Sequence, residues 1–113
     1  MLINYEDISS IKKAIEVEIP ADRISSEATR VTSEFSRHAK LPGFRPGKIP
    51  TNVVRTRFAK EIQEEVMSRL LRVSFREAIE GKGVEPVGDP QLEHLDPFIE
   101  GAPVKYKAQF EVK

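Results

Sequence analysis

The chain has 113 residues, of which 39% are hydrophobic, and its 18 Lys and Arg balance 18 Asp and Glu. This length predicts one domain at residues 1–113, and the even charge excludes a globally basic nucleic-acid or membrane protein. Cysteine is absent, the two histidines are isolated, and neither a bilayer-spanning run nor a signal peptide is evident, so we expect a cytoplasmic protein without disulfide, metal, cofactor or membrane partner.

Two short strands are predicted at the start of the chain. Ile3 and Tyr5 alternate with polar residues, and residues 11–19 carry apolar side chains at nearly every odd position. Residues 7–10 supply the turn between them. This pattern is typical of a hairpin with one buried face, which Pro20 ends.

Two long helices follow. Apolar residues recur at steps of three and four from Ile24 to Ala39, which predicts a helix that Pro42 and Gly43 end. Thr51 or Asn52 is expected to cap a second, continuous helix, which Gly81 and Gly83 end. The apolar stripe of its later turns is wide enough for that half to lie between the first helix and the sheet.

The end of the chain returns to strand patterns. Residues 84–87 could form a short strand, which residues 88–90 break, and residues 92–101 read as an acidic, proline-containing connection whose structure the sequence does not specify. Residues 104–112 alternate apolar and polar side chains in the cleanest period of two. We therefore predict an α+β fold, with an antiparallel sheet of about four strands packed against a long helical hairpin.

The tip of this hairpin is predicted at Leu41–Pro50, which reads LPGFRPGKIP. Its prolines and glycines prevent a helix or strand from continuing, so the segment is a built loop. Gly43 and Gly47 bracket Phe44, which has little core to reach at a hairpin tip. An exposed aromatic side chain among cations is typical of a docking surface.

Charge is unevenly distributed along the chain. From Ser36 to Lys60 no Asp or Glu occurs, whereas from Gly83 to Val104 no Lys or Arg occurs. The acidic stretch is typical of a solvated face. In the basic stretch the cations surround Phe44, which suits phosphate contacts together with one anchoring side chain. Its cations are Arg37, Lys40, Arg45, Lys48, Arg55, Arg57 and Lys60.

Residues 43–50, between two helices, resemble the ribosome-binding signature of trigger factor, a family of bacterial chaperones that meet nascent chains. The resemblance extends over the whole chain and implies the family's amino-terminal domain. It implies binding through Gly43, Phe44, Arg45, Pro46, Gly47 and Lys48. Some members of the family have a basic residue where this chain has Pro46.

The resemblance also implies the partners. These are the large ribosomal subunit, through the protein beside the exit tunnel and adjacent ribosomal RNA, and nascent polypeptides. Arg37, Lys40, Arg55 and Arg57 are expected to contact RNA. The family's peptidyl-prolyl isomerase domain lies beyond this segment, so we expect no enzyme activity from this chain. Monomer and homodimer both stay open.

Two other functions are compatible with the sequence. A basic helical hairpin could bind nucleic acid as a helix-turn-helix protein does, but in that case the second helix carries the cations and the turn needs no aromatic side chain. A general module that binds unfolded clients is the other alternative. The spacing of Gly43 and Gly47 does not fit a phosphate-binding P-loop. We assign no role to His38 or His94, and we expect Tyr5 and Tyr106 to fill the packed face of the sheet.

Overall fold

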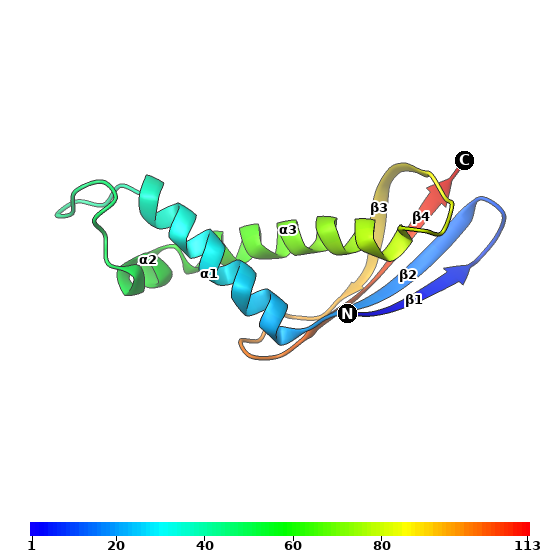
Figure 1. The fold of residues 1–113 in the computed structure, drawn as a ribbon, viewed down its shortest axis with the longest axis horizontal. Helices are drawn as coiled ribbons and strands as arrows, with labels where there is room; N and C mark the ends of the chain where they lie inside the picture. The colour runs from blue at the N-terminus through cyan, green and yellow to red at the C-terminus, as the bar shows by residue number, and fades with distance from the viewer. The chain divides into compact units, whose positions relative to one another are not determined.

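The computed structural model describes residues 1–113, which form two compact units. The sheet unit consists of Met1–Asp22 and Leu71–Lys113, and the hairpin unit consists of Arg23–Leu70. The elements follow one another in the order β1, β2, α1, α2, α3, β3 and β4 (Figure 1). No helix has the length and apolar character needed to cross a membrane. That residues 1–113 form one domain stays a prediction.

A four-stranded antiparallel sheet with the strand order β1-β2-β4-β3 is the base of the sheet unit. Its strands are β1 (Leu2–Asp7), β2 (Lys12–Ile19), β3 (Pro86–Leu95) and β4 (Val104–Val112). The α+β class with its antiparallel sheet of four strands is thus confirmed. β4 has the predicted bounds, and every second residue along it is buried.

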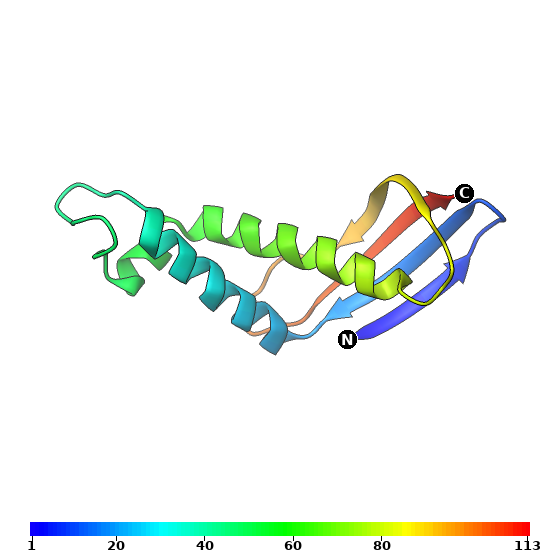
Figure 2. The same ribbon diagram turned by 45° about the horizontal axis from the view of Figure 1, so that its top comes forward.

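The carboxyl-terminal part of α3 (Ala59–Ile79) lies over one face of this sheet (Figure 2). Phe75 of α3 meets Phe110 of β4 edge to face, with ring centroids 5.1 Å apart and an interplanar angle of 87°. Next to this pair, the hydroxyls of Ser74 and Tyr106 lie 2.6 Å apart in a fully buried position. Aromatic packing and a buried hydrogen bond therefore join this end of α3 to the central strand β4.

The two tyrosines lie on this same face of the sheet but differ in burial. Tyr106 is buried, as predicted. Tyr5 lies in the edge strand β1, where it pairs with Ile15, and is only half-buried. The Lys82 ammonium lies over the Tyr5 ring, 5.3 Å from its centroid, which is a cation–π contact.

The opposite face of the sheet is polar. Oppositely charged residues of β2 and β4 stand directly across from each other on it, and each such pair contributes roughly 0.2–1 kcal/mol to a sheet. The pairs are Lys12 with Glu111, Glu16 with Lys107 and Glu18 with Lys105. This face is therefore solvated, and the core lies on the side that α3 covers.

β3 corrects the prediction for the acidic segment. We expected residues 88–90 to end a short strand and residues 92–101 to be a connection, but one strand runs over Pro86–Leu95. It accommodates Gly88 and Pro90 because its register on β4 shifts between Val87 and Gln91. As an edge strand it also has one side free of ladder hydrogen bonds, which lets proline lie within it.

The acidic residues of this segment are exposed, as expected, except Asp96, which is half-buried, and some pair with lysines near them in the sheet. Glu93 contacts Lys107 at 3.8 Å and Glu85 contacts Lys113 at 3.5 Å. His94, for which the sequence indicated no partner, lies 2.7 Å from Asp96. This hydrogen bond, followed by one from the Lys105 backbone amide, lowers the pKa of the Asp96 carboxyl.

The hairpin unit contains most of α1 (Ala21–His38), all of α2 (Thr51–Arg57) and the first half of α3. The helix pattern of α1 is confirmed, but the helix ends at His38 rather than at Pro42. The predicted cap is wrong. No side chain caps α2, and instead the Pro50 carbonyl accepts the Val53 and Val54 amides at 3.0 and 3.1 Å.

The second helix of the hairpin is also not continuous. Phe58, with φ −114° and ψ 24°, separates α2 from α3. Helical hydrogen bonds reach this residue from both sides, because its amide donates to Val54 at 2.9 Å and its carbonyl accepts from Ile62 at 2.8 Å. The Phe58 ring packs against Phe35 of α1, with centroids 6.0 Å apart. The helix break at Phe58 thus coincides with a contact to Phe35, which is distant in the sequence, and no local sequence pattern predicts it.

Candidate functional site

Two β-turns in direct succession build the tip loop, Leu41–Pro50. The first spans Leu41–Phe44 and the second spans Arg45–Lys48, and each is closed by a hydrogen bond from its last amide to its first carbonyl, at 3.2 and 3.0 Å. Each turn has proline second and glycine third. The φ angles of these glycines, 87° at Gly43 and 77° at Gly47, define type II turns. The loop thus repeats one turn whose proline and glycine both favour its shape.

The tip loop presents its chemically distinctive side chains to solvent. Phe44 ends the first turn and is 42% exposed. Arg45, Pro46 and Lys48 of the second turn are exposed as well. Ile49, directly after that turn, is only 4% exposed and ties the loop to the hairpin unit. The sequence pattern predicted the position of the loop correctly but indicated no separate role for Ile49.

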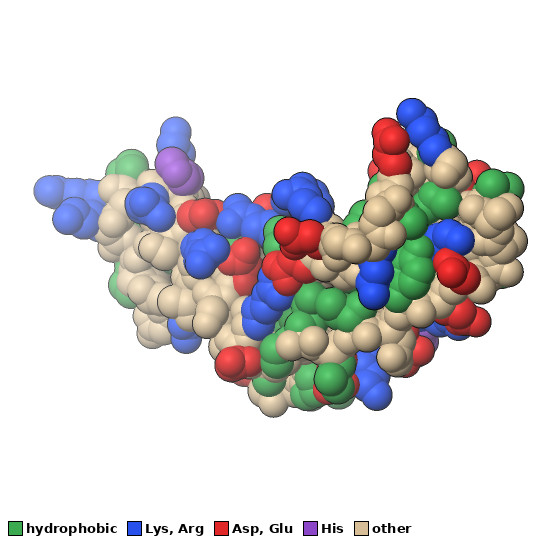
Figure 3. Space-filling view, turned by 45° about the vertical axis from the view of Figure 1, so that its right-hand side comes forward, with side chains coloured by type: hydrophobic (Ala, Val, Ile, Leu, Met, Phe, Trp, Pro, Cys, Tyr) green, Lys and Arg blue, Asp and Glu red, His purple; other side chains and the backbone are tan.

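The remaining cations of the basic stretch lie on the helices that flank the loop. Arg37 is in the last turn of α1 and Lys40 follows it, whereas Arg55 and Arg57 are in the last turn of α2. All four are exposed, and none of them forms an ion pair. Figure 3 shows several Lys and Arg side chains, in blue, at the left end of the view, where the loop lies, and others spread over the rest of this face. Since none of these four cations forms an ion pair, they are available to an anionic partner.

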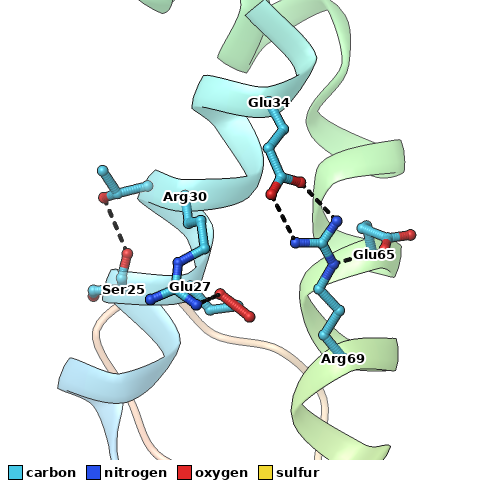
Figure 4. A network of polar contacts seen from close by, with 7 residues as sticks. Ser25, Glu27, Arg30, Glu34, Glu65 and Arg69 are labelled. Atoms are coloured by element: carbon cyan, nitrogen blue, oxygen red, sulfur yellow. Dashed lines mark hydrogen bonds and ion pairs between the residues drawn. The ribbon is translucent and has the colours of Figure 1, made fainter.

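Glu34, the acidic residue that precedes the basic stretch, forms an ion pair with Arg69. The Glu34 carboxylate of α1 accepts two hydrogen bonds from the Arg69 guanidinium of α3, at 2.6 and 3.2 Å (Figure 4). Arg69 also donates to Glu65 at 2.8 Å. The hydrogen bond from Arg69 is the main cause of the lowered pKa of Glu34, to which the charges of Arg69, Arg37 and Arg30 add. The hydrogen bonds to Glu34 and Glu65 in turn raise the pKa of Arg69.

An open groove of about 430 Å³ lies beside the end of α1. Phe35, Ala39 and Phe58 give it apolar walls, and all three are half-buried. Its other lining residues are polar, namely Glu34, His38 and Lys40. We call this hollow the Phe35–Phe58 groove. It has no group of His, Asp and Glu arranged to hold a metal ion, and no such group occurs elsewhere in the chain.

Comparison with known proteins identifies the family. The family profile of the bacterial trigger factor protein matches residues 1–113. The chain belongs to the bacterial trigger factor family. Trigger factor of Geobacter sp. strain M21 is 38% identical over 112 residues, and that of Azotobacter vinelandii is 35% identical, each covering 99% of this chain. The resemblance to this family is thereby confirmed.

The chain covers only 26% of the length of these two trigger factors. The matched part is the amino-terminal region of the family, not its isomerase domain. A solved structure, from work on promiscuous substrate recognition in the folding and assembly activities of the trigger factor chaperone, is similar with a TM-score of 0.69. It is 19% identical over 99% of this chain and 26% of its own length, so it supports the fold. The nucleic-acid-binding alternative is not favoured by these relationships.

The sequence interpretation missed the groove of this trigger factor segment. Phe35, Ala39 and Phe58 fit the helical apolar pattern, which does not distinguish them from core residues, although they line a surface hollow. His38, to which no role was given, lies on its rim. A weak signal was available, because Phe35 and Ala39 lie in the last turns of a predicted helix, where the core ends.

Proposed function

We propose that this chain is the ribosome-docking part of a cytoplasmic trigger factor chaperone. In this proposal the tip loop, Leu41–Pro50, binds the large ribosomal subunit, at the protein beside the exit tunnel and at adjacent ribosomal RNA. Newly made polypeptides would then meet the chaperone as they emerge. Family membership supports the chaperone assignment, and the geometry of the loop supports the docking role.

The main support is Phe44, which is exposed on a loop built from two hydrogen-bonded turns. Complete burial of an exposed phenylalanine contributes about 1.5–3 kcal/mol, and Phe44 keeps a large exposed fraction that a partner could cover. Because proline restricts each turn of the tip loop and a hydrogen bond closes it before binding, association costs little conformational entropy. An aromatic residue held in this way fits the anchor role.

The unpaired cations support a second, electrostatic component. Arg37, Lys40, Arg55 and Arg57 flank the loop without ion-pair partners. When such cations bind the phosphate groups of RNA, counterions are released from the RNA, which strengthens binding at low salt. Arg45, next to Phe44, can form a bidentate pair with a carboxylate or a phosphate.

Co-sedimentation with large ribosomal subunits tests the proposal. Replacing Phe44, Arg45 and Pro46 together by alanine should abolish pelleting while leaving the circular dichroism spectrum and the melting temperature nearly unchanged, because these side chains face solvent. A control variant in which Lys12, Arg72 and Lys113, outside the loop, are likewise replaced together by alanine should still pellet with the subunits. Retained pelleting of the loop variant would refute the docking role.

A further inference from the structure

The Phe35–Phe58 groove is a feature of the hairpin unit to which the proposed docking function assigns no role. Two phenylalanines line it with their rings tilted at 55° to each other and their centroids 6.0 Å apart. Both rings are only half-buried. Large apolar side chains that stay partly exposed around a hollow are typical of an interaction site.

The size of the groove limits what it can hold. A hollow of about 430 Å³ that is open to solvent admits one or two side chains rather than a folded segment. Its walls at Phe35, Ala39 and Phe58 are apolar, so an aliphatic or aromatic side chain would fit them best.

The charges around the groove restrict its occupant further. Lys40 lies on the rim, and the exposed Arg37 precedes it on the same helix end. The acidic lining residue, Glu34, already gives both carboxylate oxygens to Arg69. No acidic residue occurs between Ser36 and Lys60. The surroundings therefore favour a partner that brings negative charge.

We infer that the Phe35–Phe58 groove receives an aliphatic or aromatic side chain from an acidic protein segment on the large ribosomal subunit. This inference rests on the proposed docking function and adds a second, protein-directed contact to the one at Phe44. The apolar anchor enters between Phe35 and Phe58. The Asp and Glu residues next to it face Lys40 and Arg37.

Two other occupants fit the groove less well. A nucleobase prefers to stack on an open ring face and to hydrogen-bond along its edge, but the two rings are tilted and the Glu34 oxygens are already engaged. A second copy of this chain would bring two basic stretches together, which is unfavourable because like charges repel. Both become outcomes of the test.

Site-specific cross-linking identifies the occupant directly. The photoreactive residue p-benzoylphenylalanine replaces His38 on the rim, and the chain is irradiated while bound to large ribosomal subunits. Mass spectrometry should find a cross-linked ribosomal protein peptide that contains Asp or Glu and a large apolar residue. A cross-link to RNA or to a second copy of the chain would overturn the inference, as would retained binding without any cross-link.

Affinity measurements then separate this inference from the docking proposal. Ala39→Phe fills the groove and should weaken binding to the subunit about tenfold, provided that circular dichroism shows an intact fold. Lys40→Glu reverses one charge on the rim without disturbing packing and should also weaken binding, whereas the matched control Arg72→Glu should not. Unchanged affinity for both groove variants, with binding abolished in the Phe44, Arg45 and Pro46 variant, would refute the groove and leave docking intact. Weakened binding of both groove variants, with unchanged binding of the Phe44, Arg45 and Pro46 variant, would refute docking through the loop and support the groove.

Discussion

The hydroxyl groups of Ser74 and Tyr106 lie 2.6 Å apart, and both residues are buried. The Ser74 hydroxyl is also 3.3 Å from the Leu71 carbonyl. When Ser74 donates to that carbonyl, the Tyr106 hydroxyl donates to Ser74, so one short chain of hydrogen bonds joins α3 to β4. The sequence alone indicated that both residues are in regular structure but not that they are partners.

Removing either hydroxyl of this pair should destabilise the fold. Ser74→Ala and Tyr106→Phe each should cost about 1–3 kcal/mol, because each leaves a buried polar group with one partner fewer. The double variant should cost clearly less than the sum, since the second replacement removes a group that no longer takes part in this bond. Urea unfolding of the four proteins measures this coupling. Additive costs would show that the hydrogen bond contributes little to stability.

The glycines of the tip loop should be intolerant of side chains because of their backbone angles. A Cβ atom at Gly43 or Gly47 would meet no atom within 4 Å, but both residues have positive φ. Gly47→Ala should therefore cost roughly 1 kcal/mol in the turn and weaken ribosome binding about fivefold. Gly47→Asn should be milder, because asparagine tolerates this region better. The affinities of the wild type, Gly47→Asn and Gly47→Ala for the large ribosomal subunit should therefore fall in that order. Equal affinities of the three proteins would contradict the preformed turn.

The ion pair between Glu34 and Arg69 should stabilise the hairpin unit in a pH-dependent way. Since folding lowers the pKa of Glu34 from its ordinary value of 4.5, the stabilisation is complete above that value and disappears as the pH falls through the lowered pKa. Melting temperatures of the wild type and Glu34→Gln should differ at pH 7 and converge in acid. The difference should be small because both side chains are partly exposed.

Glu64→Gln is the control for this pH dependence. Glu64 is exposed on α3, the helix that carries Arg69, and it forms no ion pair. Its replacement should therefore leave the melting temperature unchanged from neutral pH to acid. A Glu34→Gln variant that behaved in the same way would show that the ion pair does not stabilise the fold.

Ribosome affinity should fall steeply with salt if the basic stretch binds RNA. Lys48→Gln or Arg57→Gln should each reduce the slope of log affinity against log salt by about one, because each replacement removes one cation that neutralises a phosphate. Arg72→Gln, outside the basic stretch, should leave the slope unchanged. Binding at several salt concentrations measures these slopes. A flat dependence in the wild type would mean that protein contacts dominate and that the cations are ordinary surface.

The chain should compete with a full-length trigger factor for ribosomes without catalysing prolyl isomerisation. It corresponds to the amino-terminal region of the family, and docking by a preformed loop needs only the parts that hold the loop. A proline-limited refolding assay beside a ribosome competition assay should show no acceleration but clear displacement. Accelerated refolding would contradict the assignment of catalysis to another domain, and failed displacement would contradict docking by this region.

The local sequence determined those elements whose shape depends on neighbouring residues. Strict alternation predicted β4 at Val104–Val112, because successive side chains of a strand point to opposite faces. The two Pro-Gly pairs predicted a structured tip loop, because each fixes one turn by its own backbone preferences. Residues 43–50 likewise indicated the family, because the motif that carries the resemblance is contiguous in the sequence.

Only the tertiary structure decided the features that depend on residues far apart in the sequence. β3 could not be predicted because Gly88 and Pro90 interrupt its pattern, and it forms because β4 supplies a partner that tolerates the shifted register. The groove depends on Phe35 meeting Phe58 at the helix break, and apolar periodicity cannot distinguish a core position from the wall of a hollow. Glu34 and Arg69 are 35 residues apart, so folding alone brings the carboxylate of one helix to the guanidinium of the other.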